Sequence, residues 1–298
     1  MLFSKRSWLT AVAAFVGGCS RPQPSEEQRA VTPPGPDWRE ESFDSSPDQP
    51  EGQRALLFAP NGSSDWPVLV ALHGRGEAGR GLAAGAHGWR DDYDLDVIRA
   101  RLEAGALSKS DAKEMLTDER IARHRASLAK HAWQGLRIVC PYTPVPSGGP
   151  DAWRSFANFV DKSMLPRVTQ APDRAKTGID GVSMGGRYAL ELGFGMAQRF
   201  GAVGALQPAI READAEPFAE RAEQAAGTHG KQSIQLVTSS GDPFRAPTEA
   251  LSAALARRSI AHQLIVTDGP HDYIWNRGPG AVEMLMFHER VLRGLEPV

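Results

Sequence analysis

The sequence is poor in the residues that mark several large classes of protein. It has two cysteines among 298 residues, so a scaffold built on several disulfides is excluded. Its 34 Lys and Arg nearly balance its 36 Asp and Glu, and no long basic run occurs. This charge pattern gives no indication of nucleic-acid binding.

Signals for metals and dinucleotides are also missing. The eight histidines show neither an HExxH motif nor another paired ligand spacing. No GxGxxG motif follows an apolar run, as a dinucleotide site would require. We therefore expect neither a metal ion nor an organic cofactor.

The first residues are typical of an export signal. Two basic residues in "MLFSKR" precede the apolar run "WLTAVAAFV", which is too short to span a membrane. The following "VGGC" resembles the lipobox of bacterial lipoproteins, which implies that Cys19 is lipidated and that Ser20 directs the protein to an outer membrane. The alternative is an ordinary signal peptide cleaved elsewhere, with no role for Cys19.

Composition then divides the chain into a signal peptide at 1–19, a flexible tether at 20–50 and one domain at 51–298. The tether is predicted because this stretch is rich in Pro, Ser, Glu and Gln and cannot bury a core. Alternatively, Trp38 and Phe43 dock on the domain, which would move the boundary earlier in the chain. The domain is long enough for one large α/β fold, and hydrophobic residues make up 41% of the chain.

Short apolar runs recur along the domain, and most are separated by helical patterns. Several of them are apolar almost throughout, as expected for strands covered on both faces of a parallel sheet. The alternation predicts a doubly wound, mostly parallel α/β sheet. The runs are "RALLFAP", "PVLVALHG", "LRIVCPY", "TGIDGVS", "GAVGALQPA", "IQLVTSSGD" and "HQLIVTDG".

One connection, between "LHGRG" and "LRIVCPY", is unusually long. Apolar spacing from Leu95 to Ala106 predicts one helix there, and Ser108 with Asp111 resembles a capping box for a second. The charged stretch "DERIARHRASLAKHAW" continues helically. We expect a helical insertion at about 77–134 near the functional site, or alternatively a packing appendage remote from it.

The most informative motif is "GVSMG" at 181–185, which matches the G-x-S-x-G nucleophile elbow. In that motif a serine occupies a sharp strand-to-helix turn, and the flanking glycines leave room for the strand and helix to approach. An apolar run precedes Ser183 and a helical pattern follows it, as the motif requires. A tight glycine turn with an incidental serine is the alternative.

An acid and a histidine follow Ser183 in the order that the motif requires. Asp242 comes just after one apolar run and His271 just after the next. Because parallel strands end at one edge of a sheet, the three side chains are expected to meet there. Asp242 could instead be a turn-forming aspartate, and His271 an ordinary loop residue. Three weaker candidates for the acid are Asp214, Asp268 and Asp272.

These segments resemble the α/β-hydrolases, and among them bacterial esterases of the esterase D and enterochelin-esterase kind. The resemblance rests on "LHGRG", "GVSMGGRYAL", "SSGDPF" and "GPHDYIW" and covers about residues 52–295. It implies an oxyanion hole formed by the backbone amides of Arg75 and Met184, and a substrate-binding role for Trp275. His73 is expected to position the loop. The long charged insertion departs from the family pattern.

The sequence thus predicts a serine hydrolase that cleaves carboxylic esters of small molecules through an acyl-enzyme. Ser183 is the predicted nucleophile, His271 the general base and Asp242 its orienting acid. An acyltransferase with the same triad and a non-catalytic binding lipoprotein on this fold remain alternatives. The expected location is periplasmic or at the cell surface, with membrane contact through the lipid anchor alone.

Overall fold

A mostly parallel eight-stranded sheet forms the centre of the molecule. The structure, a computed structural model, describes residues 37–46, 49–146, 150–169 and 173–298. The strand order is β1-β2-β4-β3-β5-β6-β7-β8; β1 and β2 are antiparallel to their neighbours and the other pairs are parallel. The strands are β1 (Trp38–Phe43), β2 (Gln53–Phe58), β3 (Val68–Leu72), β4 (Arg137–Pro141), β5 (Thr177–Gly181), β6 (Ala202–Leu206), β7 (Ser233–Gly241) and β8 (Gln263–Pro270).

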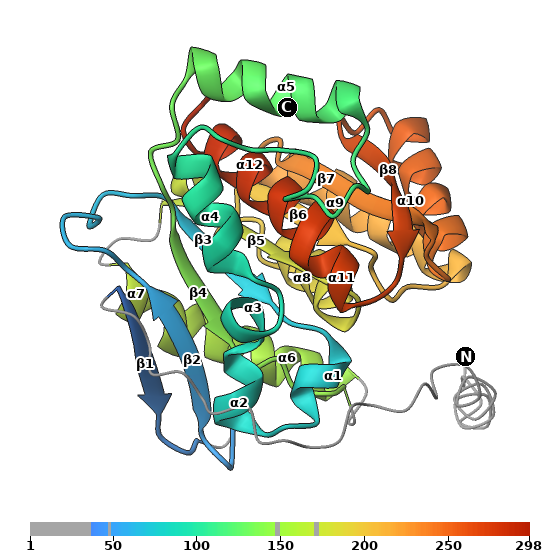
Figure 1. Cartoon of the computed structure of the whole chain (residues 1–298). Helices are drawn as coiled ribbons and strands as arrows, with labels where there is room; N and C mark the ends of the chain where they lie inside the picture. The colour runs from blue at the N-terminus through green and yellow to red at the C-terminus, as the bar shows by residue number, and fades with distance from the viewer. Residues whose placement is uncertain (1–36, 47–48, 147–149, 170–172) are drawn as a thin grey trace. The chain divides into compact units, whose positions relative to one another are not determined.

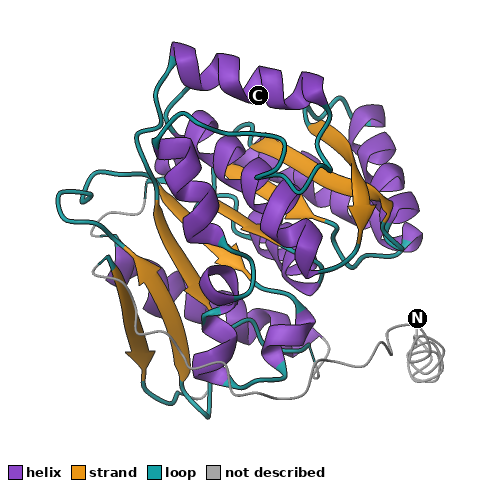
Figure 2. Ribbon diagram, viewed as in Figure 1, coloured by secondary structure: helices purple, strands orange, loops and turns teal. Residues whose placement is uncertain are grey.

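Helices cover both faces of this sheet (Figures 1 and 2). Their order along the chain confirms the doubly wound α/β architecture predicted from the sequence. The helices are α1 (Arg75–Ala78), α2 (Leu82–Ala86), α3 (Gly88–Asp91), α4 (Leu95–Glu103), α5 (Asp118–Lys130), α6 (Pro150–Asn158), α7 (Leu165–Val168), α8 (Met184–Gly195), α9 (Ala215–His229), α10 (Arg245–Arg257), α11 (Tyr273–Trp275) and α12 (Ala281–Leu292). In the described part of the chain, no helix is long and apolar enough to cross a membrane.

The two faces of the sheet have separate hydrophobic cores. One core packs α6, α8, α9 and α10 against the sheet, and the other packs α4, α5 and α12 against the opposite face. All residues of β3, β5 and β6 are buried, which explains why the sequences of β3 and β6 are apolar rather than alternating.

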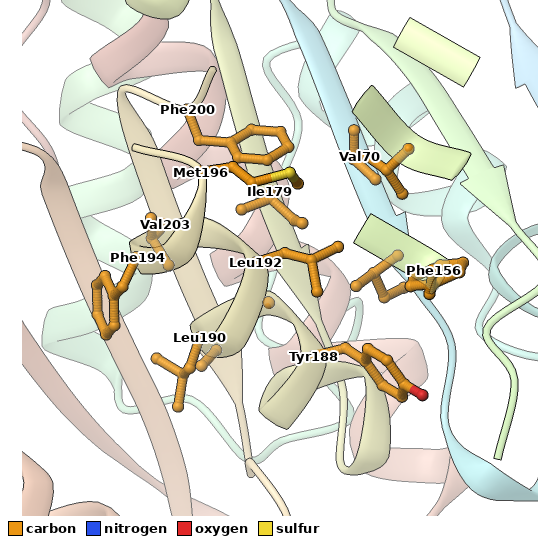
Figure 3. Close-up of a cluster of buried hydrophobic side chains, with 14 of the residues drawn as sticks. Val70, Phe156, Ile179, Tyr188, Leu190, Leu192, Phe194, Met196, Phe200 and Val203 are labelled. Atoms are coloured by element: carbon orange, nitrogen blue, oxygen red, sulfur yellow. The ribbon is translucent and has the colours of Figure 1, made fainter. Parts of the chain in front are cut away.

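Helix α8, which follows the elbow, lies on the first of these cores. Leu192 and Met196 recur one turn apart and pack with Ile179 of β5 (Figure 3). Gly193 is needed on this face, since a Cβ there would lie 2.7 Å from Val203. Packing of α8 on this core therefore fixes where the helix begins, and with it the position of the elbow.

The tether predicted at 20–50 is wrong over part of its length. Residues from Trp38 to Phe43 form β1, which pairs antiparallel with β2. Trp38 and Phe43 are both buried, so these two side chains dock on the domain, as the alternative interpretation of the sequence allows. The signal peptide at 1–19, Cys19 and the first part of the tether lie outside the described residues.

The region between β3 and β4 is helical, as its spacing predicts, but not throughout. Ser108 and Asp111 bond reciprocally in the manner of a capping box, with Ser108 N–H donating to Asp111 Oδ2 at 2.8 Å. No helix follows, because Lys113 and Glu114 have positive φ angles and turn the chain away. The next helix, α5, begins instead at a cap made by Thr117, which accepts from Arg120 N–H at 3.1 Å.

Candidate active site

Ser183 stands at the turn between β5 and α8. Its φ of 57° and ψ of −115° are unfavourable for a residue with a side chain. Two backbone bonds hold this conformation: Ser183 N–H donates to Leu206 O, and Ser183 O accepts from Ala209 N–H, each at 2.9 Å. The strain is thus maintained by the neighbouring strand β6 and the loop that follows it.

The glycines beside Ser183 are required by close approach of the backbone. A Cβ at Gly185 would lie 2.3 Å from Leu72 O, and one at Gly181 would lie 2.5 Å from the backbone of Gly185. Such distances leave no room for any side chain. The sequence motif therefore has a steric cause in this fold, as the elbow hypothesis predicts.

The structure brings together the three side chains predicted to act with one another. Ser183 Oγ lies 3.0 Å from His271 Nε2, and His271 Nδ1 lies 2.9 Å from Asp242 Oδ1. A carboxylate accepts hydrogen bonds, so Nδ1 carries the proton and Nε2 is free to accept one from the serine.

Further contacts fix Asp242 and His271. Asp242 is buried, and its carboxylate accepts from Thr238 Oγ1 at 2.7 Å and from Phe244 N–H at 2.9 Å. The Phe244 ring packs edge-on against the imidazole, with ring centroids 5.3 Å apart. These donors hold the carboxylate in place, and the carboxylate together with the Phe244 ring holds the imidazole toward Ser183.

A pair of polar side chains holds the backbone just before His271. Gln207 Nε2 donates to Pro270 O at 3.1 Å and to Ser239 Oγ at 2.7 Å, and Ser239 Oγ donates to Gly269 O at 2.6 Å. Sequence analysis missed Gln207 and Ser239. Gln207 directly follows β6 and Ser239 lies near the carboxyl end of β7, which was the available signal, but the hydrogen bonds depend on the tertiary fold.

The weaker candidates for the acid have other partners. Asp214 pairs with Arg187 and Arg211, and Asp272 caps α11 by accepting from Ile274 N–H and Trp275 N–H. Asp268 is exposed. None of the three is hydrogen-bonded to His271 in the described structure, where Asp242 occupies that place.

The loop after β3 lies beside the elbow. The Cβ position of Gly74 is 3.8 Å from Val182 O. Arg75 and Met184 are the first residues of α1 and α8, and such amides have no acceptor within their own helix. Both backbone N–H groups are therefore suited to bind a developing oxyanion.

His73 positions this loop rather than taking part in proton transfer. Burial lowers its pKa to about 4, so the ring is neutral. Its Nε2 accepts from Thr143 N–H at 2.8 Å, and Nδ1 consequently carries the proton and donates to Gly74 O at 2.8 Å. The imidazole thus links the end of β3 to the chain that follows β4.

Trp275 does not lie where a substrate could reach it. Its side chain is fully buried, and Nε1 donates to Thr267 Oγ1 at 2.7 Å. The indole belongs to the core that includes α12. The family resemblance implied a substrate contact, but the turn of α11 directs this residue into the core.

A cavity in the described part of the chain lies away from Ser183. This cavity, of about 690 Å³, lies near the amino ends of the strands, lined in part by Val68, Arg137 and Thr177, and none of the three hydrogen-bonded side chains borders it. Open α/β sheets bind ligands at the carboxyl ends of their strands, so we place the site at Ser183.

Among the residues described, no three His, Cys, Asp or Glu side chains are grouped to hold a metal ion.

Known proteins resemble this chain in fold and not in sequence. No family model and no curated protein sequence matches the chain. Among solved structures it is similar to a ferulic acid esterase, with 17% identity, a TM-score of 0.62 and coverage of 85% of this chain and 98% of that chain.

Two other solved structures extend this likeness. An S-formylglutathione hydrolase from Staphylococcus aureus is 11% identical with a TM-score of 0.60, covering 85% of this chain and 98% of that chain. The enzyme of the same name from Agrobacterium tumefaciens is 15% identical with a TM-score of 0.56, covering 86% and 95%. The chain has the α/β-hydrolase fold.

Proposed function

We propose that this protein is a serine hydrolase that cleaves carboxylic esters. The observation that carries the proposal is the continuous hydrogen-bonded series from Ser183 through His271 to Asp242 at a strained turn. Several solved structures of similar fold are named as ferulic acid esterases or S-formylglutathione hydrolases, which supports ester or thioester cleavage as the reaction class.

In the proposed mechanism Ser183 Oγ attacks the ester carbonyl while His271 Nε2 takes its proton. Asp242 holds the imidazole in the required tautomer and stabilises the imidazolium that forms. The imidazolium then gives its proton to the departing alcohol. A water activated by His271 hydrolyses the acyl-enzyme and regenerates the serine.

The amides of Arg75 and Met184 are the proposed oxyanion hole. They would donate to the carbonyl oxygen as it gains negative charge in the tetrahedral intermediate. Loss of one such donor raises the barrier by roughly 3 kcal/mol in enzymes of this type. The proposal requires no cofactor.

The test is reaction with a fluorophosphonate probe, combined with hydrolysis of p-nitrophenyl esters of increasing acyl length. We expect the wild type to be labelled and Ser183→Ala to be neither labelled nor active. His271→Ala should keep its fold and lose turnover by at least about 10³-fold. Ser64→Ala, at an exposed serine, is the matched control and should behave as wild type. Absence of labelling in the wild type would refute the proposal.

A further inference from the structure

Glu77 is a buried carboxylate that the mechanism above does not use. It lies in α1, two residues after Arg75, and is only 1% exposed. Burial of a carboxylate is strongly unfavourable unless hydrogen bonds and charges compensate it. Its partners therefore indicate what it does.

Two tyrosines donate to this carboxylate from different parts of the chain. Tyr93 Oη donates to Glu77 Oε2 at 2.5 Å, and Tyr273 Oη donates to Oε1 at 2.6 Å. Tyr93 Oη also accepts from Gly74 N–H at 3.2 Å. The carboxylate thus connects the loop before α1, the turn before α4 and the segment after His271.

The two hydroxyl groups are protonated donors at neutral pH. Burial, followed by the carboxylate of Glu77, raises the pKa of Tyr93. Burial and then the hydrogen bond to Glu77 raise the pKa of Tyr273. A guanidinium nitrogen of Arg80 lies 3.9 Å from Glu77 Oε1 and compensates part of the buried charge. The same guanidinium also forms an ion pair with Asp92.

The contact between the two loops is tight. A Cβ at Gly76 would lie 2.6 Å from Tyr273 Oη, so a side chain there would displace the hydroxyl from the carboxylate. Tyr273 is two residues from His271, and Gly74 immediately precedes Arg75. Glu77 is therefore bonded directly to Tyr273, close to His271, and through Tyr93 to Gly74, next to Arg75.

We infer that Glu77 is a positioning residue that couples the oxyanion loop to the histidine loop through Tyr93 and Tyr273; this inference rests on the proposed hydrolase function. The oxyanion amide of Arg75 and the imidazole of His271 must be correctly placed at the same moment in the reaction. Misplacement by about 1 Å can lower a rate by about 10²-fold. One carboxylate bonded to both loops fixes their relative position without touching substrate.

The primary test is Glu77→Gln, which keeps the size of the side chain. An amide offers one acceptor oxygen in place of two and carries no charge, so Tyr93 can still donate to it while the contact with Tyr273 must reverse direction, with Nε2 donating to Tyr273 Oη. Both contacts lose the negative charge that strengthens them. We expect kcat for p-nitrophenyl acetate to fall about 10- to 100-fold, with KM within about twofold of wild type. Rates are expressed per active site titrated with fluorophosphonate, which removes any effect of misfolded protein.

Tyr273→Phe removes only the link to the histidine loop. Tyr273 is 42% exposed, so the fold should be retained even if Glu77→Gln does not fold. We expect kcat to fall about tenfold. The double variant Glu77→Gln/Tyr273→Phe should lose no more than Glu77→Gln alone, because the tyrosine acts through the carboxylate. Glu103→Gln, at an exposed glutamate paired with Arg99, is the matched control and should keep wild-type kcat.

The outcomes separate the two proposals. If the wild type is active but Tyr273→Phe keeps wild-type kcat per titrated site, the positioning role is wrong. Losses that multiply in the double variant would also overturn it, since the two residues would then act independently. If the wild type neither hydrolyses esters nor reacts with the probe, the hydrolase proposal fails and the positioning role fails with it.

Discussion

Burial keeps the imidazole of His73 neutral, and this makes the free energy of unfolding depend on pH. The ring is 1% exposed and both nitrogens bond to backbone groups, so protonation would remove the acceptor that Thr143 N–H uses. The pKa is lowered from 6.5 to about 4 in the folded protein. At a pH between these two pKa values, His73 is protonated in the unfolded chain and neutral in the folded chain.

We therefore expect His73 to make the protein less stable as the pH falls from 6.5 toward 4. The unfolded state binds more protons in this window, so the free energy of unfolding decreases with decreasing pH, by up to about 3 kcal/mol. Urea unfolding at several pH values measures this slope. His73→Gln should give a flatter dependence even if it is less stable throughout, whereas His229→Gln, at an exposed histidine, should match wild type. Equal slopes in wild type and His73→Gln would contradict the assignment.

The residues predicted to react are also the ones that local sequence could reveal. Ser183, Asp242 and His271 each follow an apolar strand, and parallel strands end at one edge, so topology alone brings them near each other. Glu77 and Tyr273 carry no such signal. Their contact joins residues 196 positions apart and depends on how α1 and α11 turn, which no local pattern encodes.

At the scale of the element, the seven strands predicted from apolar runs are all present. The central strands could be recognised because burial on both faces leaves an almost continuous apolar sequence. The edge strand β8 is largely exposed, yet it keeps the apolar run from Leu264 to Val266. The edge strand β1 was missed because its middle residues are charged and lie at the surface. The sequence also predicts a helix after Ser108, where the structure has none. The capping bonds between Ser108 and Asp111 form as predicted, but the chain turns away at Lys113 and Glu114.

The junction of β5 and α8 is the element whose geometry the site depends on most. Gly185→Ala would place a Cβ 2.3 Å from Leu72 O, and backbone cannot yield as a flexible side chain can. We expect this variant to lose ester hydrolysis and probe labelling and to unfold at a lower temperature. Circular dichroism on heating and probe labelling together measure both effects.

Gly195→Ala is the matched control at the other end of α8. A Cβ there meets nothing within 4 Å, and alanine favours helix more than glycine does. Its activity should equal that of wild type, with unchanged or slightly higher stability. Full activity in Gly185→Ala would show that the elbow does not need a bare backbone at this position.

At the scale of the whole molecule, the strand order explains why distant segments form one site. β3, β5, β6, β7 and β8 lie side by side in parallel, so the loops after them reach a common edge. Sequence could predict a parallel sheet but not this order, because strand adjacency is decided by crossovers and by which helices cover each face. The helical region between β3 and β4 reaches the site through Tyr93.

Attachment to a membrane is the remaining prediction at this scale, and it rests on the signal-like first residues and the lipobox-like "VGGC" that ends at Cys19. We propose that acyl chains on Cys19 anchor the exported protein, with each buried methylene contributing about 0.8 kcal/mol. Cys19→Ala expressed in a Gram-negative host should move from the membrane fraction to the soluble fraction and keep its esterase activity, because Ser183, Asp242 and His271 all lie more than a hundred residues after Cys19 in the sequence. Cys140→Ala is the matched control, since Cys140 is the other of the two cysteines and its thiol is buried in β4; this variant should stay with the membrane. Membrane fractionation of Cys19→Ala equal to that of wild type would refute the lipid anchor while leaving the hydrolase proposal intact.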